Sequence, residues 1–178
     1  MNIQYKFTDT EIKKLLSENL TIIVDTREQQ NQHILDYFVK QKIKYVIKKL
    51  DAGDYSIKLT AAPEIGLARD LYFPVTIEKK NSVDELAGSI KDRSRFEAEF
   101  IRAKGSGTKM YLLIEDKDGY ENIVMGKYQS QYEAKAFLAS LKTFESRYNF
   151  STAFADKTYA GNFIYYTLKY YLYECLKN

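Results

Sequence analysis

The stretch VTIEKK, residues 75–80, joins an apolar, β-branched start to three consecutive charged residues. The apolar start predicts a buried strand. In a strand, residues i and i+2 project to the same face, so we expect Glu78 and Lys80 to share one space while Lys79 points away. An ordinary solvated strand end is the alternative interpretation, and the remaining charged residues decide between the two.

An earlier charged strand end comes from GDYSIKL, residues 53–59, where Asp54 follows a predicted turn. The Glu-x-Lys pattern alone carries little information, because it also occurs at residues 11–13 and 133–135. Those two copies lie in predicted helices, where residues i and i+2 do not face each other. The copy at Glu78 is the one in strand context.

Asp54 together with Glu78 and Lys80 is a residue set suited to metal-dependent hydrolysis of phosphodiester bonds. Mg²⁺ prefers oxygen ligands and is commonly held by one or two carboxylates, waters and a substrate phosphate. The metal polarises the phosphate and lowers the pKa of a bound water. A lysine beside it can orient that water and offset negative charge that develops on the phosphate oxygens.

Strand and helix patterns alternate along the chain, which indicates an α/β fold with a mixed central sheet flanked by helices. The length of 178 residues suits a single domain, residues 1–178. Capping boxes predict four helix starts, at Thr8 with Glu11, Ser82 with Glu85, Ser94 with Glu97, and Ser130 with Glu133. Strands are expected at residues 21–25, 44–50, 54–60, 75–80, 109–116 and 150–155, and helices at 8–18, 30–41, 82–90, 94–104, 130–147 and 160–176.

Composition excludes several classes of protein. The net charge is only +3, which permits a nucleic-acid partner without arguing for one. Cys175 is the single cysteine, so the chain has no internal disulfide, and a reducing cytoplasm is the expected compartment. The N-terminal residues show no apolar signal region, and no segment is apolar enough to span a membrane.

Three segments in this order resemble one family: VDTRE (24–28), GDY (53–55) and IEKKNSVDEL (77–86). They are similar to the signature of the nuclease domain of XPF-type (xeroderma pigmentosum group F) structure-specific endonucleases, and the match runs from about Thr21 to Glu115. The resemblance implies a restriction-endonuclease-like core that cleaves branched DNA, or DNA with junctions between single strands and duplex, using Mg²⁺ or Mn²⁺. The chain looks like a compact stand-alone version of the kind met in bacteriophages, which implies the cytoplasm of a bacterial or phage-infected cell.

The same resemblance assigns roles to individual residues. Those expected to act in catalysis are Asp54, Glu78 and Lys80. Those expected to hold the metal are Asp25, Asp54, Glu78 and the backbone carbonyl of Lys79. Supporting residues at the rim are expected to be Arg27, Glu28 and Asp84, although an acid at Asp84 is also favourable simply because it lies in the first turn of a helix. Candidates for contact with DNA phosphates are Arg93, Arg95 and Arg102.

The chain departs from the family pattern at two points. Lys79 stands where the family has an arginine, which keeps the charge but loses a planar, bidentate donor. Nothing after residue 115 resembles the tandem helix-hairpin-helix segment of many members. Two alternatives therefore stay open: a nuclease-inactive DNA-binding module of the same fold, or a junction resolvase or site-specific nuclease of the wider restriction-like class.

Features outside the signature have simpler interpretations. His33, the single histidine, is expected to be solvated at a polar helix start. A run of lysines is typical of a solvated face, and would suit a phosphate backbone if it flanked the site: Lys40, Lys42, Lys44, Lys48 and Lys49.

The last predicted helix is unusually aromatic. Tyr166, Tyr170 and Tyr173 form a stripe beside its apolar face, and tyrosine is enriched at protein interfaces. Family members pair through their nuclease domains, and a two-fold dimer is the commonest symmetric assembly. We expect a homodimer that buries this helix or the helix at 130–147, so that residues 130–177 are the candidates for the interface.

Overall fold

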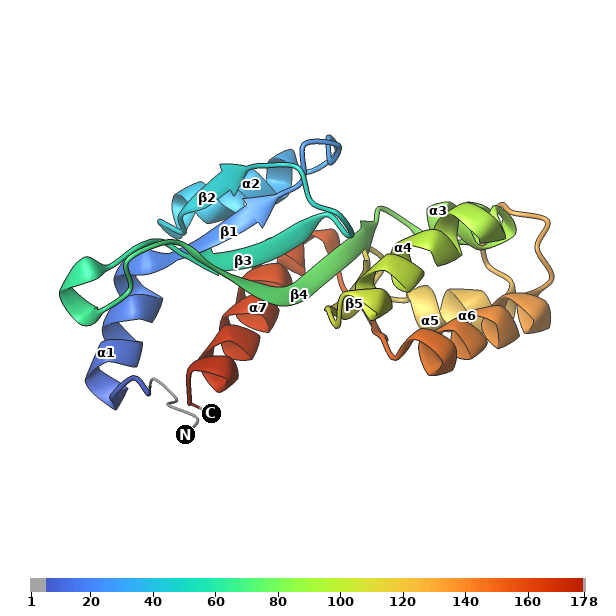
Figure 1. Ribbon diagram of the computed structural model, residues 1–178. Helices are drawn as coiled ribbons and strands as arrows, with labels where there is room; N and C mark the ends of the chain where they lie inside the picture. Colours follow the sequence, from blue (N-terminus) through green and yellow to red (C-terminus); the bar gives the residue numbers. More distant parts are fainter. Residues whose placement is uncertain (1–5, 178) are drawn as a thin grey trace.

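A mixed six-stranded sheet, ordered β2-β1-β3-β4-β5-β6, runs through the part of the chain that the structure describes (Figure 1). The structure is a computed structural model and describes residues 6–177. β3 is antiparallel to both of its neighbours and the other pairs are parallel, which confirms the expected α/β architecture with a mixed sheet. The strands are β1 Leu20–Val24, β2 Tyr45–Ile47, β3 Tyr55–Leu59, β4 Leu71–Lys80, β5 Lys109–Ile114 and β6 Ser151–Phe154.

Helices cover the two faces of the sheet at opposite ends of the molecule, with α1 and α7 under one end and α3 to α6 at the other (Figure 1). None of the helices within residues 6–177 is long and apolar enough to cross a membrane. The helices are α1 Asp9–Lys14, α2 Gln32–Lys40, α3 Val83–Lys91, α4 Arg93–Gly105, α5 Gly119–Met125, α6 Ala134–Tyr148 and α7 Ala160–Lys177, with short π or 3₁₀ turns at Leu15–Asn19, Pro63–Ile65 and Lys157–Tyr159.

Alternation along the strands divides the core into two clusters. Val75 and Ile77 of β4 face the cluster that α1, α2 and α7 cover. Leu112 and Ile114 of β5 face the cluster covered by α3, α4, α5 and α6. Since Glu78 is paired with Leu112 in a parallel register, the side chains of Glu78 and Lys80 lie on the second face. The candidate site is therefore built where the α3–α4 layer meets the end of β4.

Two of the four predicted capping boxes are found at helix starts. Thr8 accepts from the Glu11 amide while the Glu11 carboxylate accepts from the Thr8 amide, so that box is complete. Ser82 caps α3 by accepting from the Glu85 amide, but the Glu85 carboxylate accepts from the amide and side chain of Asn81, so only half of the second box forms. The box at Ser94 with Glu97 is wrong, because α4 starts at Arg93 and Glu97 binds Arg93, Arg147 and Tyr148 instead.

The box at Ser130 with Glu133 is also wrong. Glu133 is itself the N-cap of α6 and accepts from the Ala136 amide, while Ser130 accepts from the Tyr132 amide. The helix predicted at 130–147 therefore begins at Ala134, four residues after its predicted start.

Two further elements differ from the prediction. The sequence pattern does not predict α5. β4 starts earlier than predicted, at Leu71, and contains Pro74, because a register shift between Ser56 and Lys58 of β3 accommodates the proline.

Candidate active site

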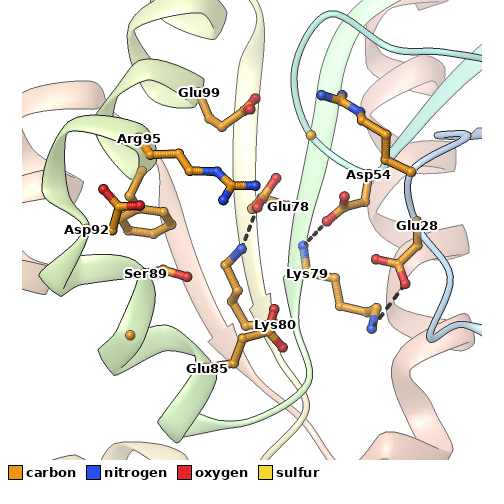
Figure 2. A pocket seen from close by; sticks show the side chains of 14 residues that line it. Glu28, Asp54, Glu78, Lys79, Lys80, Glu85, Ser89, Asp92, Arg95 and Glu99 are labelled. Atoms are coloured by element: carbon orange, nitrogen blue, oxygen red, sulfur yellow. Dashed lines mark hydrogen bonds and ion pairs between the residues drawn. The ribbon is translucent and has the colours of Figure 1, made fainter.

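Glu78 and Lys80 point into one cavity from the carboxyl end of β4 (Figure 2). Lys80 Nζ donates a hydrogen bond to Glu78 Oε1 over 2.7 Å. The side chain of Lys80 is 12% exposed and that of Glu78 is 10% exposed, so the pair is largely shielded from water. Because side chains alternate between the two faces of β4, Glu78 and Lys80 lie together as the sequence predicts, and Lys79 points to the opposite face.

Asp54 is held against β4 by backbone and side-chain hydrogen bonds. Its amide donates to the Ile77 carbonyl over 2.8 Å, and its Oδ2 accepts from the Lys79 amide over 2.7 Å. Its own carbonyl accepts from the Asp25 amide over 2.8 Å. The residue therefore bridges β1 and β4 at the point where Glu78 begins the charged end of the strand.

Gly53 makes this position possible. It has a φ of +73°, and a Cβ atom there would overlap with the Thr76 hydroxyl. Thr76 Oγ1 donates to the backbone carbonyls of Ala52 and Tyr55, which fixes the turn against β4. The Gly-Asp pair is thus a structural requirement: the glycine permits the turn and the close approach that bring the aspartate to the site.

The electrostatics of the site centre on two adjacent carboxylates and one ammonium group. Burial, and then the negative charge of Glu78, raise the pKa of Asp54 well above its ordinary value. Burial alone would lower the pKa of Lys80, but the attraction and hydrogen bond of Glu78, together with the charges of Asp54 and Glu85, outweigh it, and the pKa of Lys80 is raised. Lys80 therefore stays cationic at neutral pH, where it can donate hydrogen bonds but cannot act as a base.

The cavity has a volume of about 590 Å³ and is richer in acids than in bases. Arg27 lines it from the loop after β1, and Arg95 lines it from α4 with its guanidinium pointing toward Glu78 (Figure 2). Six acidic residues line it against four basic ones, and the side chain of one of the four, Lys79, turns away. The acidic lining residues are Glu28, Asp54, Glu78, Glu85, Asp92 and Glu99.

The sequence patterns do not single out three of these acids: Glu85, Asp92 and Glu99. A usable signal existed, because Asp92, Arg95, Phe96 and Glu99 recur at helical spacing and so share the face of α4 that looks onto β4. Glu99 is held by Arg102 through Oε1, while its Oε2 is buried without a hydrogen-bond partner in the described part of the chain. A cavity with such an oxygen favours an added cation or water.

The donor set fits a hydrated divalent cation. Within residues 6–177, no three histidine, cysteine or acidic side chains converge to form an all-protein metal cage. Mg²⁺ does not need one, since it usually keeps several waters and uses one or two carboxylates with substrate phosphates. Asp54 and Glu78, the backbone carbonyl of Lys79 and the unpartnered oxygen of Glu99 are oxygen donors of the type it prefers, and all four residues line the cavity.

Comparison with known proteins places the chain in a family. Residues 24–166 match the ERCC4 domain. The chain belongs to the ERCC4 domain family. The match contains the charged ends of β1 and β4 and the turn that carries Asp54, which confirms the resemblance to XPF-type nuclease domains. Curated protein sequences gave no match.

Solved structures show the same fold. XPF from Aeropyrum pernix matches with a TM-score of 0.61 and 16% identity over 85% of this chain, and the same protein in complex with DNA matches with a TM-score of 0.59 and 15% identity over 87%. This chain spans 65% and 66% of the length of those two chains. The fold of the ERCC4 domain described above is therefore the restriction-endonuclease-like fold of XPF-type DNA nucleases, as the sequence predicts.

Asp25 does not join the carboxylate cluster of the ERCC4 domain, contrary to expectation. Its Oδ1 accepts from the amide and Nε of Arg27, and its Oδ2 accepts from the Leu50 amide over 2.6 Å. Its side chain is fully buried and does not line the cavity. The physical reason is that the turn after β1 uses both carboxylate oxygens, so Asp25 orients Arg27 in this structure.

Asp84 also lies outside the cavity. Its Oδ1 accepts from the Gln129 and Ser130 amides and so fastens the loop before α6 to the first turn of α3. Asp84 is not a rim residue, because its carboxylate faces a neighbouring loop and not β4. Glu28 and Arg27, the other expected supporting residues, do line the cavity.

The three candidate arginines separate in the structure. Arg93 pairs with Glu97 over 3.2 Å, lies 5.0 Å over the Phe144 ring and does not line the cavity. Arg102 is bound to Glu99 and to the Asp51 carbonyl, so it braces the cavity wall from outside. Arg95 is exposed and lines the cavity, so it is the one of the three that the structure places at the candidate site.

On the opposite face of β4, Lys79 lies in a buried polar network. Its ammonium donates to Asn81 over 2.6 Å and lies 3.7 Å from Glu28 and 3.8 Å from Glu115. His33 is not solvated as expected: its Nε2 is 2.5 Å from Glu115 Oε1, because the first turn of α2 packs onto the end of β5. The lysine that replaces the family arginine thus has two carboxylate partners.

Proposed function

We propose that this ERCC4 domain is a Mg²⁺- or Mn²⁺-dependent endonuclease that hydrolyses phosphodiester bonds in DNA, at branches or at junctions of single strands with duplex. The observation that carries the proposal is the convergence of Asp54, Glu78 and Lys80 in one acid-rich cavity. DNA as the substrate is supported by membership of the family and by the fold shared with an XPF protein that binds DNA.

Asp54, Glu78 and the Lys79 carbonyl would hold the metal. When bound, the metal supplies a Lewis acid that polarises the phosphate and makes a bound water more acidic. Lys80 acts as a hydrogen-bond donor: its raised pKa keeps the ammonium charged, so it can orient the attacking water and stabilise charge on the phosphate oxygens. Its bond to Glu78 holds the ammonium in place before substrate arrives.

Arg27 and Arg95 bind phosphates on opposite sides of the catalytic residues. Arg27 is oriented by Asp25, and Arg95 extends from α4 without a competing acid in the described residues that pairs with it. Guanidinium groups match the oxygens of a phosphate through two parallel hydrogen bonds. Their placement would draw the DNA backbone over Glu78 and Lys80.

Two other functions compete with this proposal. In a nuclease-inactive DNA-binding module of the same fold, we would expect one of the three catalytic side chains to be missing or to point away, and here all three line the cavity. A junction resolvase or site-specific nuclease would use the same residues on a different substrate. Cleavage of a panel of branched and plain DNA structures separates these possibilities.

For the assembly, we propose that residues 1–178 act as one nuclease domain and pair as a homodimer. Of the two helices considered, α6 is the better candidate, because its neighbour α5 exposes Tyr120, Val124 and Met125. Lys142 of α6 lies 5.6 Å over the Tyr120 ring, so α6 borders this apolar patch with a charged side chain. Such a patch suits burial against a second copy.

The test is cleavage of labelled flaps, forks, four-way junctions and plain duplex, each with Mg²⁺, with Mn²⁺ and with EDTA. The proposal predicts cuts near the branch point that require the metal. Binding without cleavage under every condition would favour the inactive module. Cuts set by sequence in plain duplex would favour the site-specific enzyme.

A further inference from the structure

A second, basic groove lies at the end of the sheet away from the catalytic cavity. It has a volume of about 440 Å³ and is bordered by the turn after α1, the chain entering β2, and α7. Four lysines line it, together with Tyr165, and none of its lining residues is acidic: Lys13, Lys42, Lys44 and Lys169. The neighbourhood of α1 and α7 is visible in Figure 1 beneath the first strands of the sheet.

The charges of this groove are not neutralised by ion pairs within residues 6–177. None of its four lysines takes part in an ion pair with any residue in the range 6–177. Lys44 donates to the Glu18 carbonyl over 2.5 Å, and Lys169 lies 5.3 Å and 5.9 Å over the rings of Tyr165 and Tyr166. Uncompensated ammonium groups around one concavity favour a polyanionic ligand.

Exposed aromatic rings adjoin the lysines. Tyr166 and Tyr170 are 43% and 57% exposed, although they lie on a helix whose opposite side is buried in the core. Their rings stack on each other with centroids 6.2 Å apart and an interplanar angle of 21°. A basic groove beside exposed rings is the combination that binds single-stranded nucleic acid, whose bases are free to stack. The bases of a duplex could not reach these rings.

Lysines also connect the groove with the catalytic end along the edge strand β2. Lys44 precedes β2, and the exposed Lys48 and Lys49 follow it. The next residue, Leu50, accepts a hydrogen bond from Arg27 of the catalytic cavity. The two ends of the sheet are separated by about the length of the neighbouring five-residue strand β1, which is about 16 Å. About five nucleotides of a stacked single strand would span this distance, at ~3.4 Å each.

We infer that this groove, with the tyrosines of α7, binds single-stranded DNA, and that the bound strand is the unpaired arm of the branched substrate. The identity of the arm rests on the proposed nuclease function, whereas the binding itself does not. A second copy of the chain is a poor occupant, because a two-fold axis would bring the uncompensated lysines of both copies together.

The test is fluorescence anisotropy with a labelled oligothymidylate of about 15 nucleotides, within the range that such sites cover, in EDTA and at several salt concentrations. The variant Lys13→Gln/Lys42→Gln/Lys169→Gln removes three charges from the groove. Its matched control, Lys127→Gln/Lys135→Gln/Lys157→Gln, removes three exposed charges elsewhere. The groove variant should bind at least about tenfold more weakly, with a salt slope smaller by about 2, since each phosphate contact on a single strand contributes ~0.7.

A second variant, Tyr166→Leu/Tyr170→Leu, separates stacking from charge. It should weaken binding of the single strand by about tenfold without changing the salt slope, because base stacking involves no counterion release. Equal affinities of the groove variant and the lysine control would overturn the inference, and so would an equal loss for duplex and single strand. Conversion of a dimer to a monomer by the tyrosine variant would assign α7 to the protein interface instead.

The same proteins distinguish this inference from the proposed function. Loss of single-strand binding in EDTA by the groove variant, in a protein that cleaves no DNA with any metal, would support the groove and contradict the nuclease. Metal-dependent cleavage of a flap with the same rate and position in the groove variant as in the native chain would contradict the groove alone.

Discussion

The carboxyl group of Asp54 lies where its charged form is disfavoured, because burial and the neighbouring Glu78 both raise its pKa. A carboxyl with a raised pKa binds its proton more tightly in the folded state than in the unfolded chain. Folding stability attributable to this group is therefore present at low pH and is lost as the pH rises from the unfolded value, about 3.9, through the higher folded value. A bound cation would offset the same cost.

We predict that Asp54→Asn stabilises the protein at neutral pH while it abolishes cleavage. The amide oxygen can still accept from the Lys79 amide, and the buried negative charge is gone. Tm should rise by roughly 2–4 °C for each kcal/mol gained in a chain of this size, and the gain should disappear near pH ~4. Thermal melts across pH check this, with added Mg²⁺ expected to raise the Tm of the native protein only. A lower Tm for the variant at pH 7 would contradict the assignment.

The arginines of α4 allow a matched pair of variants two residues apart. Arg95 lines the cavity, whereas Arg93 is paired with Glu97 outside it. We predict that Arg95→Gln weakens binding to all duplex sequences equally and lowers the salt slope by about 0.9, the value for one phosphate of B-DNA. Arg93→Gln should leave both quantities unchanged. Filter binding at several salt concentrations measures them, and equal effects of the two variants would be evidence against the cavity as the DNA site.

At the scale of single elements, prediction from sequence succeeded where the signal is local. The alternation of β4 places Glu78 and Lys80 on one face without help from the rest of the fold. The capping box at Thr8 is likewise complete within four residues. The box at Ser94 failed because Glu97 has partners from α6 that the local sequence cannot show.

The predicted site residues that lie outside the cavity show the same dependence on tertiary contacts. Asp25 and Asp84 have the residue type and the position in the sequence that a ligand would need. Each carboxylate is instead used by backbone amides of a segment distant in sequence, at Leu50 for Asp25 and at Gln129 and Ser130 for Asp84. His33 differs from its predicted solvated environment because its partner, Glu115, lies at the end of another strand. Whether an acid is free for a ligand is decided by tertiary contacts.

The turn before β3 provides a test of how the backbone positions the site. Gly53→Ala should cost at least about 2 kcal/mol of stability and most of the activity, because the added methyl group meets Thr76 and the positive φ disfavours alanine. Gly105→Ala is the control, since open space surrounds that position and its backbone is helical. Urea denaturation and a cleavage assay give the two readouts. Equal stability of both variants would mean that the turn adapts and does not position Asp54.

For the whole molecule, the two core clusters meet along the paired strands β4 and β5. The same pair carries Glu78, Lys80 and the Lys79 network, so the site lies between the two halves of the core. Catalytic geometry and global stability are therefore linked, and we expect the chain to unfold as one cooperative unit.

Assembly is the second property at this scale. Val124 and Met125 of α5 are 51% and 64% exposed, and we predict that they are buried in a homodimer. Light scattering at tens of micromolar should give the mass of a dimer for the native chain and of a monomer for Val124→Glu/Met125→Glu, with an unchanged circular dichroism spectrum. A native monomer would contradict the homodimer, and a dimer that survives this double substitution would show that Val124 and Met125 are not at its interface.

Lys80 and the adjacent carboxylates are proposed to form a metal-dependent nuclease site, and the decisive measurement is single-turnover cleavage of a flap by Lys80→Ala. With Mg²⁺ present, the rate should fall by about 10²–10³, the usual effect of removing one donor that stabilises transition-state charge, while Tm shows that the protein remains folded. Lys117→Ala, at an exposed lysine after β5, should cleave at the native rate, and EDTA should stop every protein. Native activity in Lys80→Ala, or full activity in EDTA, would contradict the account.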